Sequence, residues 1–481
     1  MNKISINFDI PESYYNKAKY IFSIYSKAWG IPLNIYRNQS IAKDADIVYT
    51  RSTQNAQWDE RIIIPFDERL YEKNTECDVI TKNGYSLWVN SSEKINIDLI
   101  ASTYRLLNFT DETQINPNAR DDKGIFLIQA LPDNRKKITK LPIVEDHINF
   151  LLKKLLINNP SLEKSIIPRW PNGKKYVLSI THDTDATNLG SPKELLANLT
   201  KLLIRQDRVF FEMFKDGLKH VGNIVGNPLF GFSGWKEYES LNNATSCFYL
   251  YVKPQKVKVH LNDCKSNLKN EIKEWNILRQ LAENNWEFGF HPSINAKNNI
   301  DEFIYGKQLL ESKLGTNIYG LRHHYWALDW FRPYLTFRKH VNAGFKYDTS
   351  IAWKDEPGFR AGTCLPFQPF DIKRDKPFDL YELPTCLMDG HIIKSNVVSS
   401  DIIQAGKNII ETIKKRSGVA VLDWHTESYC NTYVYKNYLE ILQNILKDYY
   451  NDSDLWIATP WEIIKWWHRR SLILMEGKYD R

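Results

Sequence analysis

The sequence predicts an α/β protein in which a distorted (β/α) barrel of seven or eight units follows a small α/β domain. Apolar segments of strand length recur eight times between residues 176 and 460, and amphipathic helical patterns separate most of them. Polar residues stand at the C-terminal ends of several of these segments, which in such barrels form the active-site end. At 481 residues the chain is also too long for one compact core, which favours two domains.

Residues 1–160 alternate short apolar runs with helical patterns and predict the small N-terminal domain. An amphipathic helix is expected over 14–30, ended by Gly30, and another over 145–159 closes the domain. The linker 161–175 contains two prolines and a glycine and is a good boundary. Strands are expected over 4–10, 45–50, 61–66, 85–90 and 124–130, with a further helix over 96–109. No motif in this domain indicates chemistry.

Residues 170–475 predict the barrel. The expected strands cover 176–181, 245–252, 286–291, 317–324, 345–350, 381–388, 418–425 and 455–460. The expected helices cover 268–285, 302–315, 401–417 and 438–450. An insertion at about 188–245, with a helix over 192–206, interrupts the alternation after the first strand, and we expect it to form a lid or a partner surface.

Charge and cysteine usage exclude several classes of protein. The net charge of +7 is mild, and no arginine-rich block indicates nucleic acid as a partner. The excess suits weak attraction to an anionic glycan or a membrane surface, and thus peripheral association with a membrane. The six cysteines are scattered, which indicates reduced thiols. Without a secretory signal or an apolar run of about 18 residues, we expect a cytoplasmic protein with no transmembrane segment.

The segment SITHDTD places two carboxylates at the end of the first barrel strand. Side chains alternate along a strand, so Asp183 and Asp185 face the same way. A cation beside them relieves their mutual repulsion. The alternative is a solvent-facing loop with two acids, against which the preceding buried apolar strand argues.

Three later strands also end in polar residues. His291 ends WEFGFH, and an imidazole beside carboxylates suits zinc or a similar divalent ion. Arg322 follows an apolar strand and can bind a carboxylate through paired hydrogen bonds. The next two residues are both histidines that alternate in direction, so only one should enter the site. His425 ends the seventh strand and can act as a general acid.

These motifs, in this order, resemble those of the polysaccharide deacetylases, the NodB-homology carbohydrate esterases. The resemblance covers about 300 residues, from about 170 to 475, and is strongest to a branch with THDxD, HPS and Arg-x-His-Tyr motifs. It implies a distorted (β/α) barrel in which a divalent metal, here zinc by ligand type, and a bound water remove an acetyl group from an N-acetylated sugar. The N-terminal region resembles a domain that often precedes this branch.

The resemblance implies a role for each matching residue. Asp183 corresponds to the general base, Asp185 and His291 to metal ligands, Arg322 to the arginine that holds the base, and His425 to the acid that protonates the leaving amine. The remaining matches, which we interpret as substrate contacts, are His324, Tyr325, Glu382, Pro384 and Asp389.

The sequence departs from the family pattern at Asn295, where a second metal-binding histidine usually stands. The metal is then held by Asp185, His291 and a third group, which can be Asn295, His324 or water. The leading function is deacetylation of a surface polysaccharide or its precursor. The alternatives are a catalytically silent glycan-binding or polysaccharide-assembly protein, and a hydrolase of a non-sugar linear amide.

Overall fold

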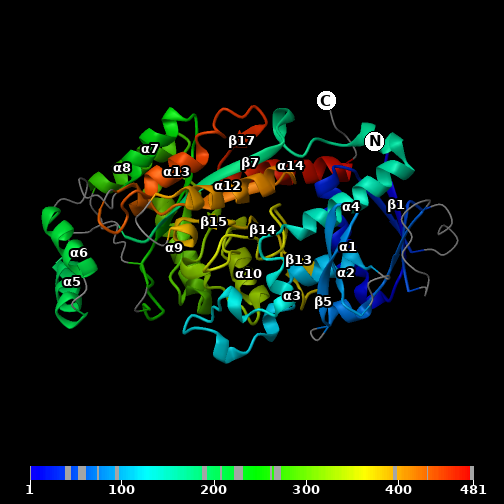
Figure 1. Ribbon diagram of the computed structural model, residues 1–481, viewed down its shortest axis with the longest axis horizontal. Coiled ribbons are helices and arrows are strands. Elements are labelled where there is room, and N and C mark those ends of the chain that lie inside the picture. The colour runs from blue at the N-terminus through cyan, green and yellow to red at the C-terminus, as the bar shows by residue number, and fades with distance from the viewer. Residues whose placement is uncertain are drawn as a thin grey trace.

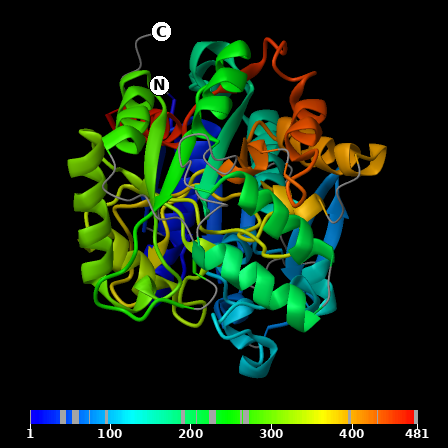
Figure 2. The same ribbon diagram turned by 90° about the vertical axis from the view of Figure 1, so that its left-hand side faces the viewer.

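The computed structural model contains two main parallel sheets with helices packed around them (Figures 1 and 2). One continuous hydrophobic core includes residues of both. The structure describes residues 2–37, 45–51, 61–72, 75–92, 97–186, 192–205, 208–221, 231–260, 263–264, 272–393, 398–430 and 432–476. Within these ranges no helix is long and apolar enough to span a bilayer.

The smaller sheet, at the right of Figure 1, is built from the first 65 residues in the order β2-β1-β3-β4. Its strands are β1 (Ile4–Asp9), β2 (Leu33–Tyr36), β3 (Ile47–Thr50) and β4 (Ile62–Pro65), and a hairpin of β5 (Cys77–Lys82) and β6 (Tyr85–Asn90) follows. The helices are α1 (Glu12–Trp29), α2 (Leu99–Leu107), α3 (Asp133–Lys136) and α4 (Ile143–Asn158). Gly30 ends α1 as predicted, with φ of 77°, and a Cβ there would collide with the carbonyl oxygen of Ile167.

The strand predicted over 124–130 does not form. Side-chain carboxylates bind the backbone N–H groups that a strand would need: Asp121 accepts from Ile125 at 2.9 Å, and Asp355 accepts from Ile128 at 3.2 Å. Phe126 packs instead against Trp353, at 6.3 Å between ring centroids. The apolar run is thus buried as a loop, because local carboxylates compete with sheet pairing.

The larger sheet contains the eight predicted barrel segments, all in parallel pairing. Its order is β14-β11-β10-β9-β8-β7-β16-β15, with β17 also paired to β7. The strands are β7 (Tyr176–Thr184), β8 (Cys247–Tyr251), β9 (Glu287–His291), β10 (Gly320–Leu321), β11 (Tyr347–Asp348), β14 (Tyr381–Glu382), β15 (Leu387–Met388), β16 (Val419–Asp423) and β17 (Leu455–Ile457). The predicted α/β class with a barrel-like parallel sheet is therefore confirmed.

The segment predicted as one strand over 381–388 is observed as two short strands that pair on opposite sides. Its first half, β14, pairs with β11, and its second half, β15, pairs with β16. Between them Leu383 donates to the carbonyl of Asp348 at 2.9 Å, and Cys386 donates to that of Val421 at 3.1 Å. This one segment therefore joins the two ends of the sheet and closes the strands into a ring.

Helices alternate with the barrel strands, as the periodicity predicts. They are α7 (Phe232–Leu241), α8 (Ile272–Glu283), α9 (Ile300–Leu314), α10 (Pro333–Asn342), α11 (Asp389–Ile392), α12 (Ser400–Lys414), α13 (Tyr438–Leu446) and α14 (Pro460–Glu476). A small hairpin of β12 (Phe370–Asp371) and β13 (Lys376–Pro377) lies between β11 and β14. Within the predicted insertion, α5 (Pro192–Arg205) and α6 (Arg208–Lys219) project at the left of Figure 1. Residues 187–191, 206–207 and 222–230 of that region lie outside the described ranges.

The N-terminal segment is attached to the barrel by buried polar contacts as well as by the shared core. The Arg360 guanidinium pairs with the Glu112 carboxylate at 2.9 Å, with both side chains almost fully buried. Helix α1 packs against α14. The division into domains at 160–170 stays a prediction.

The buried His147 of α4 should make the protein sensitive to mild acid. Its Nε2 accepts a hydrogen bond from the backbone N–H of Trp88 at 2.9 Å, and burial lowers the pKa of His147 from 6.5 to about 3. At pH values between about 3 and 6.5, His147 is protonated in the unfolded chain but stays neutral in the folded chain. The free energy of unfolding should therefore fall as the pH drops below 6.5, by up to about 1.4 kcal/mol per pH unit.

Urea unfolding of wild type and His147→Gln at several pH values between 4 and 7, roughly this window, tests that expectation. Glutamine keeps an acceptor for Trp88 and removes the titration, so the variant should show a shallower pH dependence. His468→Gln, at an exposed histidine, should behave like wild type. Equal slopes in wild type and His147→Gln would refute the assignment.

Candidate metal centre and catalytic groups

Four strands deliver polar side chains to one end of the ring. β7 carries Asp183 and leads into Asp185, β9 ends at His291, and β10 and β16 are followed by further polar residues. Because parallel strands end at the same edge, these side chains meet. The full set is Asp183, Asp185, His291, Arg322, His324, Asp423 and His425.

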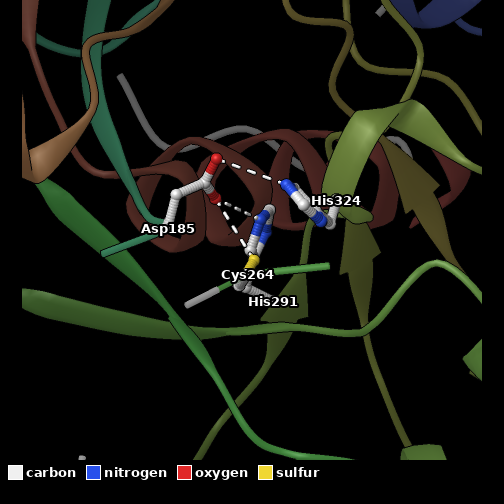
Figure 3. A group of neighbouring side chains, drawn as sticks. All are labelled: Asp185, Cys264, His291 and His324. Carbon is white, nitrogen blue, oxygen red and sulfur yellow. Dashed lines mark hydrogen bonds and ion pairs between the residues drawn. The ribbon is translucent and has the colours of Figure 1, made fainter. Parts of the chain in front are cut away.

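Four of the side chains in this end of the barrel converge on one point, as Figure 3 shows. The Asp185 carboxylate lies 3.3 Å from His291 Nε2, 3.3 Å from His324 Nε2 and 3.3 Å from Cys264 Sγ. One ligand atom from each residue lies within 4.8 Å of every other. An oxygen, a sulfur and two imidazole nitrogens are the donor types that zinc prefers.

The hydrogen bonds of the two imidazoles suit metal binding. His291 Nδ1 lies 2.7 Å from the carbonyl oxygen of Arg322, which can only accept, so Nδ1 carries the proton. Its Nε2 is then a free lone pair, buried and without a hydrogen-bond partner among the described residues. His324 Nδ1 lies 3.4 Å from the Asp263 carboxylate. Histidine ligands usually donate their second N–H to such acceptors, so the residues present fit a divalent ion.

Electrostatics favours a charged pair at this point in the metal-free protein. Burial would raise the pKa of Asp185, but the nearby His324 outweighs it and holds that pKa well below its usual range. Burial would lower the pKa of His324, but Asp185 and Asp263 raise it to about 9. A cation that binds here must displace the His324 proton, so metal affinity should increase with pH.

The backbone turns sharply directly after His324. Tyr325 and Trp326 both have φ of 56°, a left-handed backbone conformation that residues other than glycine adopt at an energetic cost. His323 points the other way, with its Nε2 2.9 Å from His340 Nε2. One histidine of the pair thus enters the site and the other is buried behind it, as strand alternation predicts.

Arg322 binds the carboxylate that precedes the metal group. Its Nη1 lies 3.1 Å from Asp183 Oδ1 and 3.2 Å from Asp423 Oδ1, and all three side chains are buried. Its other nitrogens donate to Thr349 Oγ1 at 2.9 Å and Thr385 Oγ1 at 3.1 Å. Burial, with Asp183 nearby, raises the pKa of Asp423 to about 8. The arginine is therefore fixed from four sides and holds Asp183 in one orientation.

His425 is held by a carboxylate of its own. Its Nδ1 lies 3.0 Å from Asp389 Oδ1, and its backbone N–H donates to Asp389 Oδ2 at 3.1 Å. Burial would lower the pKa of His425, but Asp389 and Asp423 raise it well above its usual value. Its Nε2 lies 3.7 Å from Asp185 Oδ2, so a protonated imidazole borders the metal group.

The other predicted site residues have different surroundings. Asn295 donates from its side chain to the carbonyl of Lys258 at 2.7 Å. Tyr325 is 38% exposed, with the Lys123 ammonium 5.0 Å from its ring centroid. Glu382 is fully buried and accepts from the Ile351 N–H at 3.0 Å, while Asp389 lies behind His425. Their assignment as metal ligand or substrate contacts stays a prediction.

Sequence reasoning missed several groups. Asp423 stands two residues before His425, so the alternation along β16 could have placed it in the site. Glu427 is buried just beyond, and burial with Asp185 nearby raises its pKa to about 8. Cys264 and Asp263 follow no strand directly, and no pattern in the sequence singles them out.

Known proteins show only distant likeness to this chain. No protein-family model matches it, and no curated protein matches it. Among solved structures it is similar to ones named as polysaccharide deacetylases from Mycobacterium smegmatis (16% identity, TM-score 0.41, 63% of this chain and 93% of that one) and Pseudomonas aeruginosa PAO1 (12%, 0.41, 63% and 95%). It is also similar to the allantoinase PuuE (11%, 0.41, 63% and 93%). The function of this chain is therefore inferred from its own residues.

Removal of Asp185 or His291 should abolish metal retention. Wild type and Asn295→Ala should keep close to one zinc per chain after dialysis against a weak chelator, because the Asn295 amide is engaged with Lys258. Asp185→Ala and His291→Ala should lose zinc affinity by more than the roughly 10- to 100-fold that is typical when a residue hydrogen-bonded to a metal ligand is removed. Elemental analysis with circular dichroism as a folding check measures this. Equal metal content in all four proteins would place the ion elsewhere.

Proposed function

We propose that this protein is a metal-dependent deacetylase that removes the N-acetyl group from a sugar of a surface polysaccharide or its precursor. One observation supports the proposal. The Asp183 carboxylate held by Arg322, the candidate metal group around Asp185 and the His425 imidazole lie together at one end of the barrel. Single ligand atoms of Asp183, Asp423 and His425 lie within 4.8 Å of one another, beside the group around Asp185. Hydrolysis of an acetamide needs these three functions together.

The side chains divide the reaction between them. Asp183, oriented by Arg322, accepts a proton from the water that attacks the acetyl carbonyl carbon. His425, held by Asp389, donates a proton to the sugar nitrogen as the C–N bond breaks. Acetate and a free amine result. A divalent ion held by Asp185, His291 and His324 would polarise the carbonyl and lower the pKa of the attacking water.

The exposed ring of Tyr325 supports a sugar as the substrate. It directly follows His324 and is 38% exposed, so part of the ring is accessible beside the metal group. Sugar C–H faces pack well on aromatic rings. A non-sugar linear amide would use the same catalytic groups but would not need this ring.

A catalytically silent glycan-binding protein is the second candidate. The observation that favours it is the set of four protein donors around Asp185, because a metal with four protein ligands has no open position. Acetate release from a panel of N-acetylated glycans and linear amides distinguishes the candidates.

Asp183→Asn should retain the fold and the metal while losing activity. Asparagine keeps the shape and the contact with Arg322 but cannot accept the proton. Loss of a positioned base usually lowers the rate by about 100- to 10,000-fold. Acetate release by wild type, Asp183→Asn and the surface control Asp379→Asn measures the effect. Unchanged release by Asp183→Asn would defeat this mechanism, and no release by wild type on any substrate would favour the silent binder.

Asp389→Asn should move the alkaline limb of the pH–rate profile to lower pH. The Asp389 carboxylate raises the pKa of His425, and the acid works only while protonated, so the rate falls as the pH rises through that pKa. Without the Asp389 carboxylate, the rate should begin to fall at a lower pH. The profile of kcat/KM for both proteins tests the shift. A raised KM with an unshifted limb would instead support the predicted substrate contact.

A further inference from the structure

Cys264 differs from the other cysteines in its surroundings. Of the six thiols, five are buried, and Cys264 is half-buried with its Sγ 3.3 Å from Asp185 Oδ1. It lies in the connection between β8 and α8, whereas the other donors lie at or just after the ends of strands. Figure 3 shows the sulfur pointing toward the same point as the two imidazoles.

The distances from Asp185 to the other donors suit a tetrahedral ion. With metal–ligand bonds of about 2.0–2.3 Å, tetrahedral ligands lie about 3.3–3.8 Å apart. Asp185 Oδ1 lies 3.3 Å from His291 Nε2 and from Cys264 Sγ, and Asp185 Oδ2 lies 3.3 Å from His324 Nε2. One ligand atom of each of the four residues lies within 4.8 Å of every other. The buried His291 Nε2, which has no hydrogen-bond partner among the described residues, is directed at the same place.

The residue before Cys264 fixes its position. Asp263 is buried and accepts from the Ile294 N–H at 3.1 Å and from the His260 N–H at 3.3 Å. It also lies 3.4 Å from His324 Nδ1. The same carboxylate therefore orients one imidazole and anchors the chain that presents the thiol, so both donors are positioned together.

We propose that Cys264 is a fourth protein ligand of the metal, and that its sulfur must leave before water or a substrate oxygen can take that position. This rests on the proposed function, in which the ion needs an open position. Catalytic zinc sites keep one position free, whereas sites with four protein ligands are closed. Binding converts the thiol to a thiolate and releases one proton to solvent, and departure of the sulfur takes one proton up. The resting centre is thus closed by the chain itself.

Cobalt substitution tests the ligand directly. The full chain loaded with Co²⁺ should show the intense near-ultraviolet absorption of a thiolate-to-cobalt charge transfer. Cys264→Ala should lose this absorption while still binding one cobalt, and Cys77→Ala, at a buried thiol of β5, should keep it. Its absence from wild type with stoichiometric cobalt would overturn the proposal.

Thiol protection gives a second test on the wild-type chain, which does not depend on the variant folding. Iodoacetamide followed by peptide mass spectrometry should label Cys264 in the chelator-treated protein and leave it unlabelled when zinc is bound. Equal labelling in both states would contradict a zinc–sulfur bond.

The closed position is tested with acetohydroxamate, a small ligand that needs an open site. If about one wild-type molecule in ten is open, cobalt-loaded Cys264→Ala should bind it about tenfold more tightly than wild type. Equal affinities would show that the sulfur does not block the position. Charge transfer without acetate release from any substrate would support Cys264 as ligand and count against the deacetylase. Acetate release without the charge-transfer absorption would support the deacetylase and count against Cys264 as a ligand.

Discussion

A single buried guanidinium holds the active end of the barrel together. Arg322 ties Asp183 of β7 to Asp423 of β16, and it also binds Thr349, which follows β11, and Thr385, which lies between β14 and β15. Its carbonyl oxygen also fixes the tautomer of His291. A buried charge is costly unless it is paired, and loss of one partner of such a pair typically costs about 3–5 kcal/mol. The geometry of the Asp183 and Asp423 carboxylates at the strand ends therefore depends on one residue.

The same region holds ionisable groups whose pKa values are shifted by their environment. Asp183 and Asp423 share one arginine, and burial, with Asp183 nearby, raises the pKa of the deeper Asp423 to about 8. His425 has two carboxylates near it and is kept protonated. The burial and the neighbours of each group therefore set its pKa.

The N-terminal segment borders this end of the barrel and does not merely precede it. The carboxylate of Asp122 lies 3.1 Å from His260 Nε2, and the Lys297 ammonium donates to the carbonyl of Lys123 at 2.6 Å. Lys123 in turn lies over the ring of Tyr325. These contacts come from the residues just before 124–130, the segment wrongly predicted as a strand, where the Asp121 carboxylate accepts from the backbone N–H groups of Lys123 and Ile125.

The sequence by itself determined the alternation of strands and helices, and it placed Asp183, Asp185, His291, Arg322 and His425 at strand ends. Period-two and helical patterns are local, and parallel strands must end at one edge, so this part follows without coordinates. Only the tertiary structure decided which groups complete the site. Cys264 and Asp263 come from a connection, Asn295 turns to Lys258, and residues 381–388 pair on both sides at once. These outcomes depend on contacts between segments far apart in the chain, which no local pattern records.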